Sequence, residues 1–121
     1  KLARHVTSAE IHPDLAARAK ASLAAARIGN VTLLVGDSAR APLGEKAYDV
    51  IVLTGSTPVL PAAFVSRLNP GGRLVAVVGD APVMKAVLLE QAGPGETRRT
   101  ELFETMLRPL VNAESPARFR F

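Results

Sequence analysis

The chain has 121 residues, 48% of them hydrophobic, which is enough for one modest domain with a packed core. It contains no cysteine, which excludes disulfides, thiolate metal sites and a cysteine nucleophile and fits a cytoplasmic protein. The formal net charge is +4, but the basic residues are scattered among acidic ones, so no nucleic-acid partner is expected. No apolar run is long enough to span a membrane, so no membrane partner is expected either.

The first part of the chain predicts alternating strands and helices, the order of a mostly parallel α/β sheet. Strands are expected at residues 5–11, 31–35, 48–54 and 73–78, and the strand at 31–35 is expected to be buried. The alanine-rich stretch from Asp14 to Ile28 predicts a helix, because alanine has the highest helix propensity. Pro13 suits its first turn, His12 is a possible cap, and Gly29-Asn30 is expected to end it in the left-handed conformation.

The rest of the chain predicts a short helix and then an antiparallel strand pair. Pro58 and Pro61 bracket the helix start, and Leu60, Phe64 and Leu68 fall on one of its faces. Asn69-Pro70-Gly71-Gly72 reads as a turn. Residues 83–91 and 98–107, joined by a turn at 92–95, predict a hairpin on the edge of the sheet, and residues 112–121 an irregular tail.

Polar groups follow three of the predicted strands at their carboxyl ends. They are Glu10, Asp37 and the stretch Thr54-Gly55-Ser56. Ligands of open parallel sheets bind outside the carboxyl ends of the strands, so these positions predict one site.

The residue types at these strand ends suit an adenosine. A carboxylate at position 10 can accept both hydroxyl donors of a ribose, and Asp37 can accept from the amino group of adenine. The alternative is that both acids only cap turns, which is common chemistry for Asp after Gly.

Other catalytic patterns are missing from the sequence. It has neither a phosphate-binding G-x-x-x-x-G-K-[ST] loop nor a G-x-S-x-G nucleophile motif. His5 and His12 are too isolated to form a metal site, so no metal is expected. Asp80, which follows a predicted strand, is a weaker site candidate.

Four blocks of the sequence resemble the protein-L-isoaspartate O-methyltransferase family. They are S-A-E-I-H-P-D-L-A-A-R-A (8–19), N-V-T-L-L-V-G-D (30–37), Y-D-V-I-V-L-T-G-S-T-P-V-L-P (48–61) and L-N-P-G-G-R-L-V-A-V-V-G (68–79). The resemblance implies a Rossmann-like methyltransferase sheet that binds S-adenosylmethionine, releases S-adenosylhomocysteine and methylates isoaspartyl groups of proteins as a repair reaction. It implies that Glu10 holds the ribose and Asp37 the adenine, and that Ile11, Ser38, Thr54 and Gly55 belong to the same cofactor site.

The chain also departs from the family pattern. Thr54-Gly55-Ser56-Thr57-Pro58 stands where the family usually reads T-A-A-A-P, and Ser38 stands where it has glycine. Met106-Leu107-Arg108-Pro109-Leu110 stands in the block that usually reads V-R-F-V-P-L. A sibling branch with another methyl acceptor, or with none, is therefore an alternative.

By the same resemblance, the glycine-rich loop, its central strand and the N-terminal segment with the catalytic hydroxyl are expected upstream of residue 1. Residues 1–121 are then the C-terminal part of a single methyltransferase domain, inactive alone, with no catalytic residue assigned. An unpaired central position in a sheet is costly, so the missing strand is expected from upstream residues, a cleaved piece or a swapped copy.

Two further function classes compete with the methyltransferase. A non-catalytic module can keep the nucleotide pocket, or only the fold, for binding or assembly. An NAD-dependent oxidoreductase also places an acid after its second strand, but such enzymes usually continue in parallel where this chain predicts a hairpin.

Overall fold

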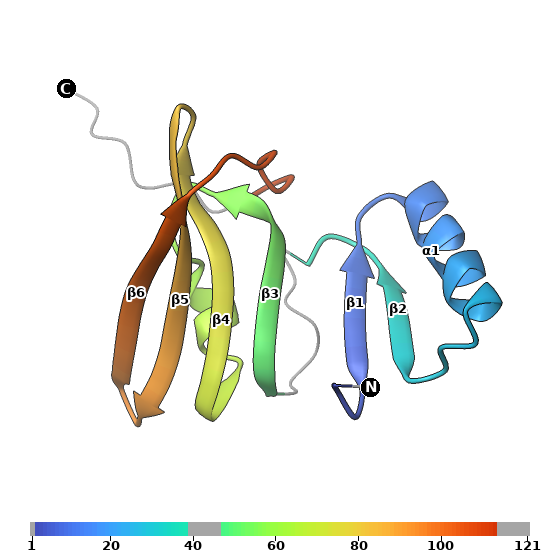
Figure 1. Ribbon diagram of the computed structural model, residues 1–121, viewed down its shortest axis with the longest axis horizontal. Helices are drawn as coiled ribbons and strands as arrows, with labels where there is room; N and C mark the ends of the chain where they lie inside the picture. The colour runs from blue at the N-terminus through green and yellow to red at the C-terminus, as the bar shows by residue number, and fades with distance from the viewer. Residues whose placement is uncertain (1, 39–46, 114–121) are drawn as a thin grey trace. The chain divides into compact units, whose positions relative to one another are not determined.

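The computed structural model describes residues 2–38 and 47–113, and the end of the predicted irregular tail lies outside them. The described residues fall into two compact units, residues 2–38 and residues 47–113. The first unit contains a two-stranded sheet in the order β1-β2, and the second a four-stranded sheet in the order β3-β4-β5-β6 (Figure 1).

The first unit is a β-α-β crossover made of β1 (Val6–Glu10), α1 (Pro13–Ala25) and β2 (Val31–Val35). The two strands are parallel, as predicted, and run in register from Val6 opposite Val31 to Glu10 opposite Val35. Pro13 occupies the start of the helix, where its missing N–H costs nothing. His12 holds the N-cap position, but its side chain makes no capping hydrogen bond, so it caps by backbone conformation alone.

The predicted end of this helix was wrong. The helix stops at Ala25 rather than Ile28, and the left-handed residue is Arg27, with φ 56°, not Gly29 or Asn30. The Ile28 N–H reaches back to the Leu23 carbonyl over 2.9 Å and the Arg27 N–H to the Ala24 carbonyl over 3.1 Å. These are the two bonds of a Schellman motif, which satisfies the last helical carbonyls and tolerates a non-glycine residue here.

The prediction that residues 31–35 form a buried strand was half right. The strand exists, but Leu34 is 39% exposed and Val35 57% exposed. An apolar run favours the strand by its β-propensity, whereas burial depends on what covers each face.

The second unit is a mixed sheet built from β3 (Tyr48–Thr57), β4 (Leu68–Asp80), β5 (Val83–Gly93) and β6 (Glu96–Glu104). β3 and β4 are parallel, and β4, β5 and β6 form an antiparallel meander (Figure 1). The predicted edge hairpin is thus confirmed. Gly95, with φ 71°, follows Pro94 in its tight turn, the arrangement that a type II turn requires.

The larger of two hydrophobic clusters in this unit contains Phe64 of the short helix α2 (Ala62–Val65), and a smaller cluster of Val77, Met84 and Ala86 occupies the alternate positions of β4 and β5, on the other face of the sheet. Phe64, Leu68 and the partly buried Leu60 do pack in one cluster, with Leu53 and Leu74 among others. The predicted helix face was wrong, because Leu60 precedes α2 and Leu68 already belongs to β4. Residues 69–72, predicted as a turn before the strand, instead form an irregular stretch inside β4. Leu68 before this stretch pairs with Tyr48, and regular pairing with β3 resumes at Arg73, opposite Val50.

Candidate functional site

Glu10 ends β1 and is held in a defined conformation. Its carbonyl accepts a hydrogen bond from the Gly36 N–H at 3.0 Å, which continues the β1–β2 ladder by one step. Its side-chain Oε1 accepts from the His12 N–H at 3.1 Å. The carboxylate therefore caps the turn before α1, as the alternative reading expected, and this bond occupies only one of its two oxygens.

Asp37 and Ser38 follow the end of β2, and both are half-buried. Because Glu10 lies opposite Val35 in a parallel ladder, Asp37 stands two positions beyond the residue that pairs with Glu10. The half-buried Ile11 directly follows Glu10. The first unit thus brings Glu10, Ile11, Asp37 and Ser38 to the same carboxyl edge of two parallel strands, as the sequence predicted.

The sequence predicted that Thr54 and Gly55 close their strand. The structure places them inside it, because β3 continues to Thr57. Thr54 is exposed, whereas Gly55 is buried against the segment after β6. A Cβ on Gly55 would lie 2.7 Å from Leu110 Cδ2 and 3.1 Å from the Arg108 carbonyl oxygen, so the position needs glycine for close packing. That Thr54 and Gly55 share a site with Glu10 stays a prediction.

Ser56 is the residue that sequence reasoning undervalued. Its N–H donates to the Arg108 carbonyl at 2.9 Å, its carbonyl accepts from the Leu110 N–H at 2.8 Å, and its Oγ donates to the Leu107 carbonyl at 3.1 Å. The side chain is 1% exposed. The sequence signal for this contact was the pair of small residues Gly55-Ser56 after an apolar run, since glycine in a strand often marks the close approach of another backbone.

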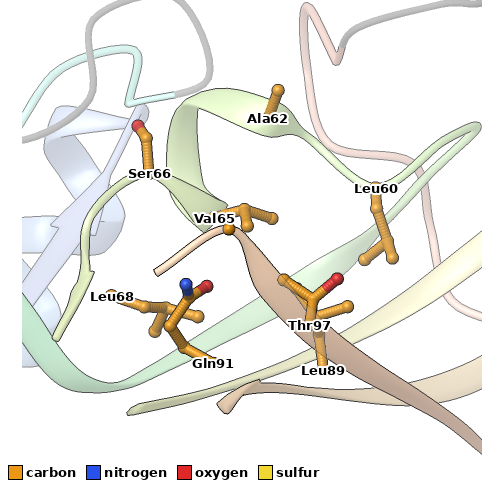
Figure 2. Close-up of a pocket in the computed structure, with 9 residues that line it drawn as sticks. Leu60, Ala62, Val65, Ser66, Leu68, Leu89, Gln91 and Thr97 are labelled. Carbon is orange, nitrogen blue, oxygen red and sulfur yellow. The ribbon is translucent and has the colours of Figure 1, made fainter. Parts of the chain in front are cut away.

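Each unit has a hollow lined mainly by apolar residues. One, of about 480 Å³, is lined in the second unit by residues of α2, β4, β5 and β6, among them Leu68, Leu89, Gln91 and Thr97 (Figure 2). Leu68 pairs with the first residue of β3, so this hollow is at the amino end of that strand. The other, of about 380 Å³ in the first unit, is bordered by Val6 and Val31, the first residues of β1 and β2.

The remaining polar candidates have structural partners or lie in a turn. The His5 ring nitrogen Nε2 is 2.8 Å from Thr32 Oγ1, and Asp80 is an exposed residue at the turn between β4 and β5. The Lys85 ammonium, hydrogen-bonded to Glu101 at 3.0 Å, lowers the pKa of that carboxyl group. Over residues 2–38 and 47–113, no group of acidic and histidine side chains could hold a metal ion. No helix in those ranges has the length and apolarity to cross a membrane.

Solved structures with the same fold define the class of protein. A Plasmodium falciparum chain described as a protein-L-isoaspartate O-methyltransferase, in complex with S-adenosyl-L-homocysteine, superimposes with a TM-score of 0.77 at 17% identity. The match covers 88% of this chain and 52% of that one. A second protein-L-isoaspartate O-methyltransferase structure superimposes with a TM-score of 0.75 at 23% identity over 87% of this chain and 33% of that one. The chain therefore has the α/β fold of these methyltransferases.

The sequence defines the family within that class. The family model for protein-L-isoaspartate(D-aspartate) O-methyltransferase matches residues 2–115. Protein-L-isoaspartate O-methyltransferase 1 of Anaeromyxobacter sp. is 38% identical over 93% of this chain and 54% of its own length. The Methanoculleus marisnigri enzyme of that name is 39% identical over 80% of this chain and 44% of its own length. The chain belongs to the protein-L-isoaspartate(D-aspartate) O-methyltransferase family and spans about half the length of the curated relatives it matches.

Proposed function

We propose that the protein to which this chain belongs transfers a methyl group from S-adenosylmethionine to the carboxylate of an isoaspartyl residue in a protein or peptide. The observation that supports it is the Glu10 carboxylate, held by the His12 N–H at the carboxyl edge where β2 also ends. Family membership supplies the reaction class, and the Plasmodium relative was solved with the demethylated cofactor.

The chemistry of the cofactor suits this arrangement. Two neighbouring ribose hydroxyls are donors and an ionised carboxylate only accepts, so one Glu10 side chain can bind both. Asp37 and Ser38, half-buried beyond β2, are the groups proposed to accept from the adenine amino group and to border the ring. A sulfonium methyl is already activated, so transfer requires mainly that nucleophile, methyl and sulfur be aligned. Methyl transfer from S-adenosylmethionine therefore requires no acid–base group among these residues.

Among the described residues, β3 pairs with a strand on one edge only, which supports a further part of the proposal, namely that a strand outside residues 1–121 pairs with its other edge. β3 is the first strand of its sheet, and Val50 and Val52 on it are each 59% exposed. An apolar strand with one unpaired edge binds another strand readily. We assign the pairing strand to the same methyltransferase domain, where it comes either from residues upstream of this chain or from a swapped copy. We also propose that the whole protein is cytoplasmic.

Calorimetry with S-adenosylhomocysteine tests the cofactor site in the full-length protein. Glu10→Gln keeps an oxygen for the His12 N–H but replaces the second acceptor by an amide donor. It should weaken binding by about 1.5–3 kcal/mol, the value of a charge-assisted hydrogen bond. Glu10→Ala should weaken it at least as much. His12→Ala is the matched control, because the bond to Glu10 uses the His12 backbone and survives the change.

Two outcomes would contradict the proposal at different levels. Unchanged affinity in Glu10→Gln and Glu10→Ala would remove Glu10 from the cofactor site. Binding of NAD in place of S-adenosylhomocysteine would overturn the methyltransferase assignment. Methyl transfer to an isoaspartyl peptide, followed with a labelled methyl group, then separates the repair enzyme from a non-catalytic module that binds the cofactor but transfers nothing.

A further inference from the structure

The segment after β6 returns to the carboxyl end of β3 and is fixed there (Figure 1). The Thr105 N–H first bonds to the Met84 carbonyl at 3.2 Å. Ser56 then makes three hydrogen bonds to residues 107–110, and Pro109 pairs with it as a short parallel bridge. Leu110 fills the space that a side chain on Gly55 would need. The backbone of residues 107–110 is thus anchored to β3 by these hydrogen bonds and by the packing of Leu110.

Arg108 stands in the middle of this fixed segment. Its carbonyl is bonded to Ser56, and Pro109 restricts its backbone to extended conformations. The residue is exposed, and over the described residues its guanidinium takes part in no ion pair. A guanidinium stays charged at all physiological pH values and binds carboxylates in a bidentate manner. Among residues 2–38 and 47–113, the fold therefore places a cation with no ion-pair partner at the carboxyl end of β3, the end of a parallel strand where ligands bind.

We propose that Arg108 is a specificity-determining residue that favours isoaspartyl substrates carrying a second acidic residue beside the reacting one. This inference rests on the proposed function, since it assumes that the acceptor peptide passes the carboxyl end of β3. The methyl acceptor keeps its own carboxylate free to attack, and Arg108 pairs with the neighbouring acid. Met106, which is exposed in the same segment, offers the peptide an apolar contact beside the charge.

The test compares two isoaspartyl peptides that differ only in the neighbouring residue, Glu in one and Gln in the other, with the full-length protein. We expect the unmodified protein to show a kcat/KM about three- to fivefold higher for the Glu peptide, which is the upper part of the range for an exposed ion pair. Arg108→Val should bring the ratio to about one by removing that pair, and Arg108→Lys should keep part of it. Arg108→Glu should reverse the preference, towards a peptide with Lys at that position.

The controls separate this inference from the proposed function. Each variant should bind S-adenosylhomocysteine as the unmodified protein does, which shows that it is folded. Methyl transfer to both peptides with the same Glu-to-Gln ratio in the unmodified protein and in Arg108→Val would overturn the role of Arg108 alone. Failure to methylate either peptide would overturn the proposed function and this inference with it.

Discussion

Two adjacent hydroxyls at the end of β3 should affect stability in opposite directions. Ser56 and Thr57 are each 1% exposed. Ser56 Oγ donates to the Leu107 carbonyl at 3.1 Å, whereas Thr57 Oγ1 is buried with no hydrogen-bond partner in the described structure. A satisfied buried hydroxyl contributes to stability, and an unsatisfied one lowers it.

The magnitudes follow from these environments. An unpaired hydroxyl costs about 1–3 kcal/mol to bury, and valine has the shape of threonine with a methyl in place of that hydroxyl. Thr57→Val should therefore raise the free energy of unfolding by about 1–2 kcal/mol. Ser56→Ala removes one hydrogen bond and should lower it by about 0.5–1.5 kcal/mol. Thr57→Ser keeps the orphan hydroxyl and loses a buried methyl, so it should lower the free energy by about 1 kcal/mol.

Urea denaturation of the full-length protein measures these differences. With a slope of about 2 kcal/mol/M, the Thr57→Val midpoint should rise by about 0.5–1 M without a change in slope. Ser56→Ala should move the midpoint the other way. If Thr57→Val lowered the midpoint, the hydroxyl would have a partner in the whole protein, and our reasoning about this position would be wrong.

The remaining predictions concern the helix end, a hairpin and an ion pair. Arg27→Gly should raise the free energy of unfolding by up to about 1 kcal/mol, because φ at this position is 56° and glycine adopts it without strain; a lower urea midpoint would contradict this. Gly79→Ala should destabilise strongly, because φ is 125° and a Cβ would meet the Val83 carbonyl oxygen; a melting temperature equal to that of the unmodified protein would refute it. The pKa of Glu101 is lowered, first by its hydrogen bond to Lys85, so the stability it adds is present above its unfolded pKa and is lost as pH falls through its folded pKa. Lys85→Met should return the Glu101 pKa towards its ordinary value in an NMR titration, and an unchanged titration would show that the pair does not act.

The chain's local pattern was sufficient to predict most elements of the fold. The alanine-rich stretch, the apolar runs and the Pro-Gly turn predicted α1, the six strands and the β5–β6 hairpin, because propensity and turn chemistry act between near neighbours, whereas the antiparallel pairing of β4 with β5 was not predicted. The same pattern put Glu10 and Asp37 at the ends of β1 and β2. Two parallel strands joined by one helix place their carboxyl ends at one edge without help from the rest of the chain.

Contacts between distant parts of the chain determined features that the local sequence pattern did not predict. β3 runs on to Thr57 because Ser56 and Thr57 pair with Val77 and Val78 of β4, and Ser56 also bonds to residues 107–110. The small residues around Gly55 indicate that another backbone approaches, but not which distant segment supplies it. The end of α1 is a different case: the two bonds that close the helix, from the Arg27 and Ile28 N–H groups to the Ala24 and Leu23 carbonyls, are local, and glycine preference alone placed the end too late, at Gly29. A residue's type is local, but the groups that satisfy its hydrogen bonds and cover its surface are supplied by the fold.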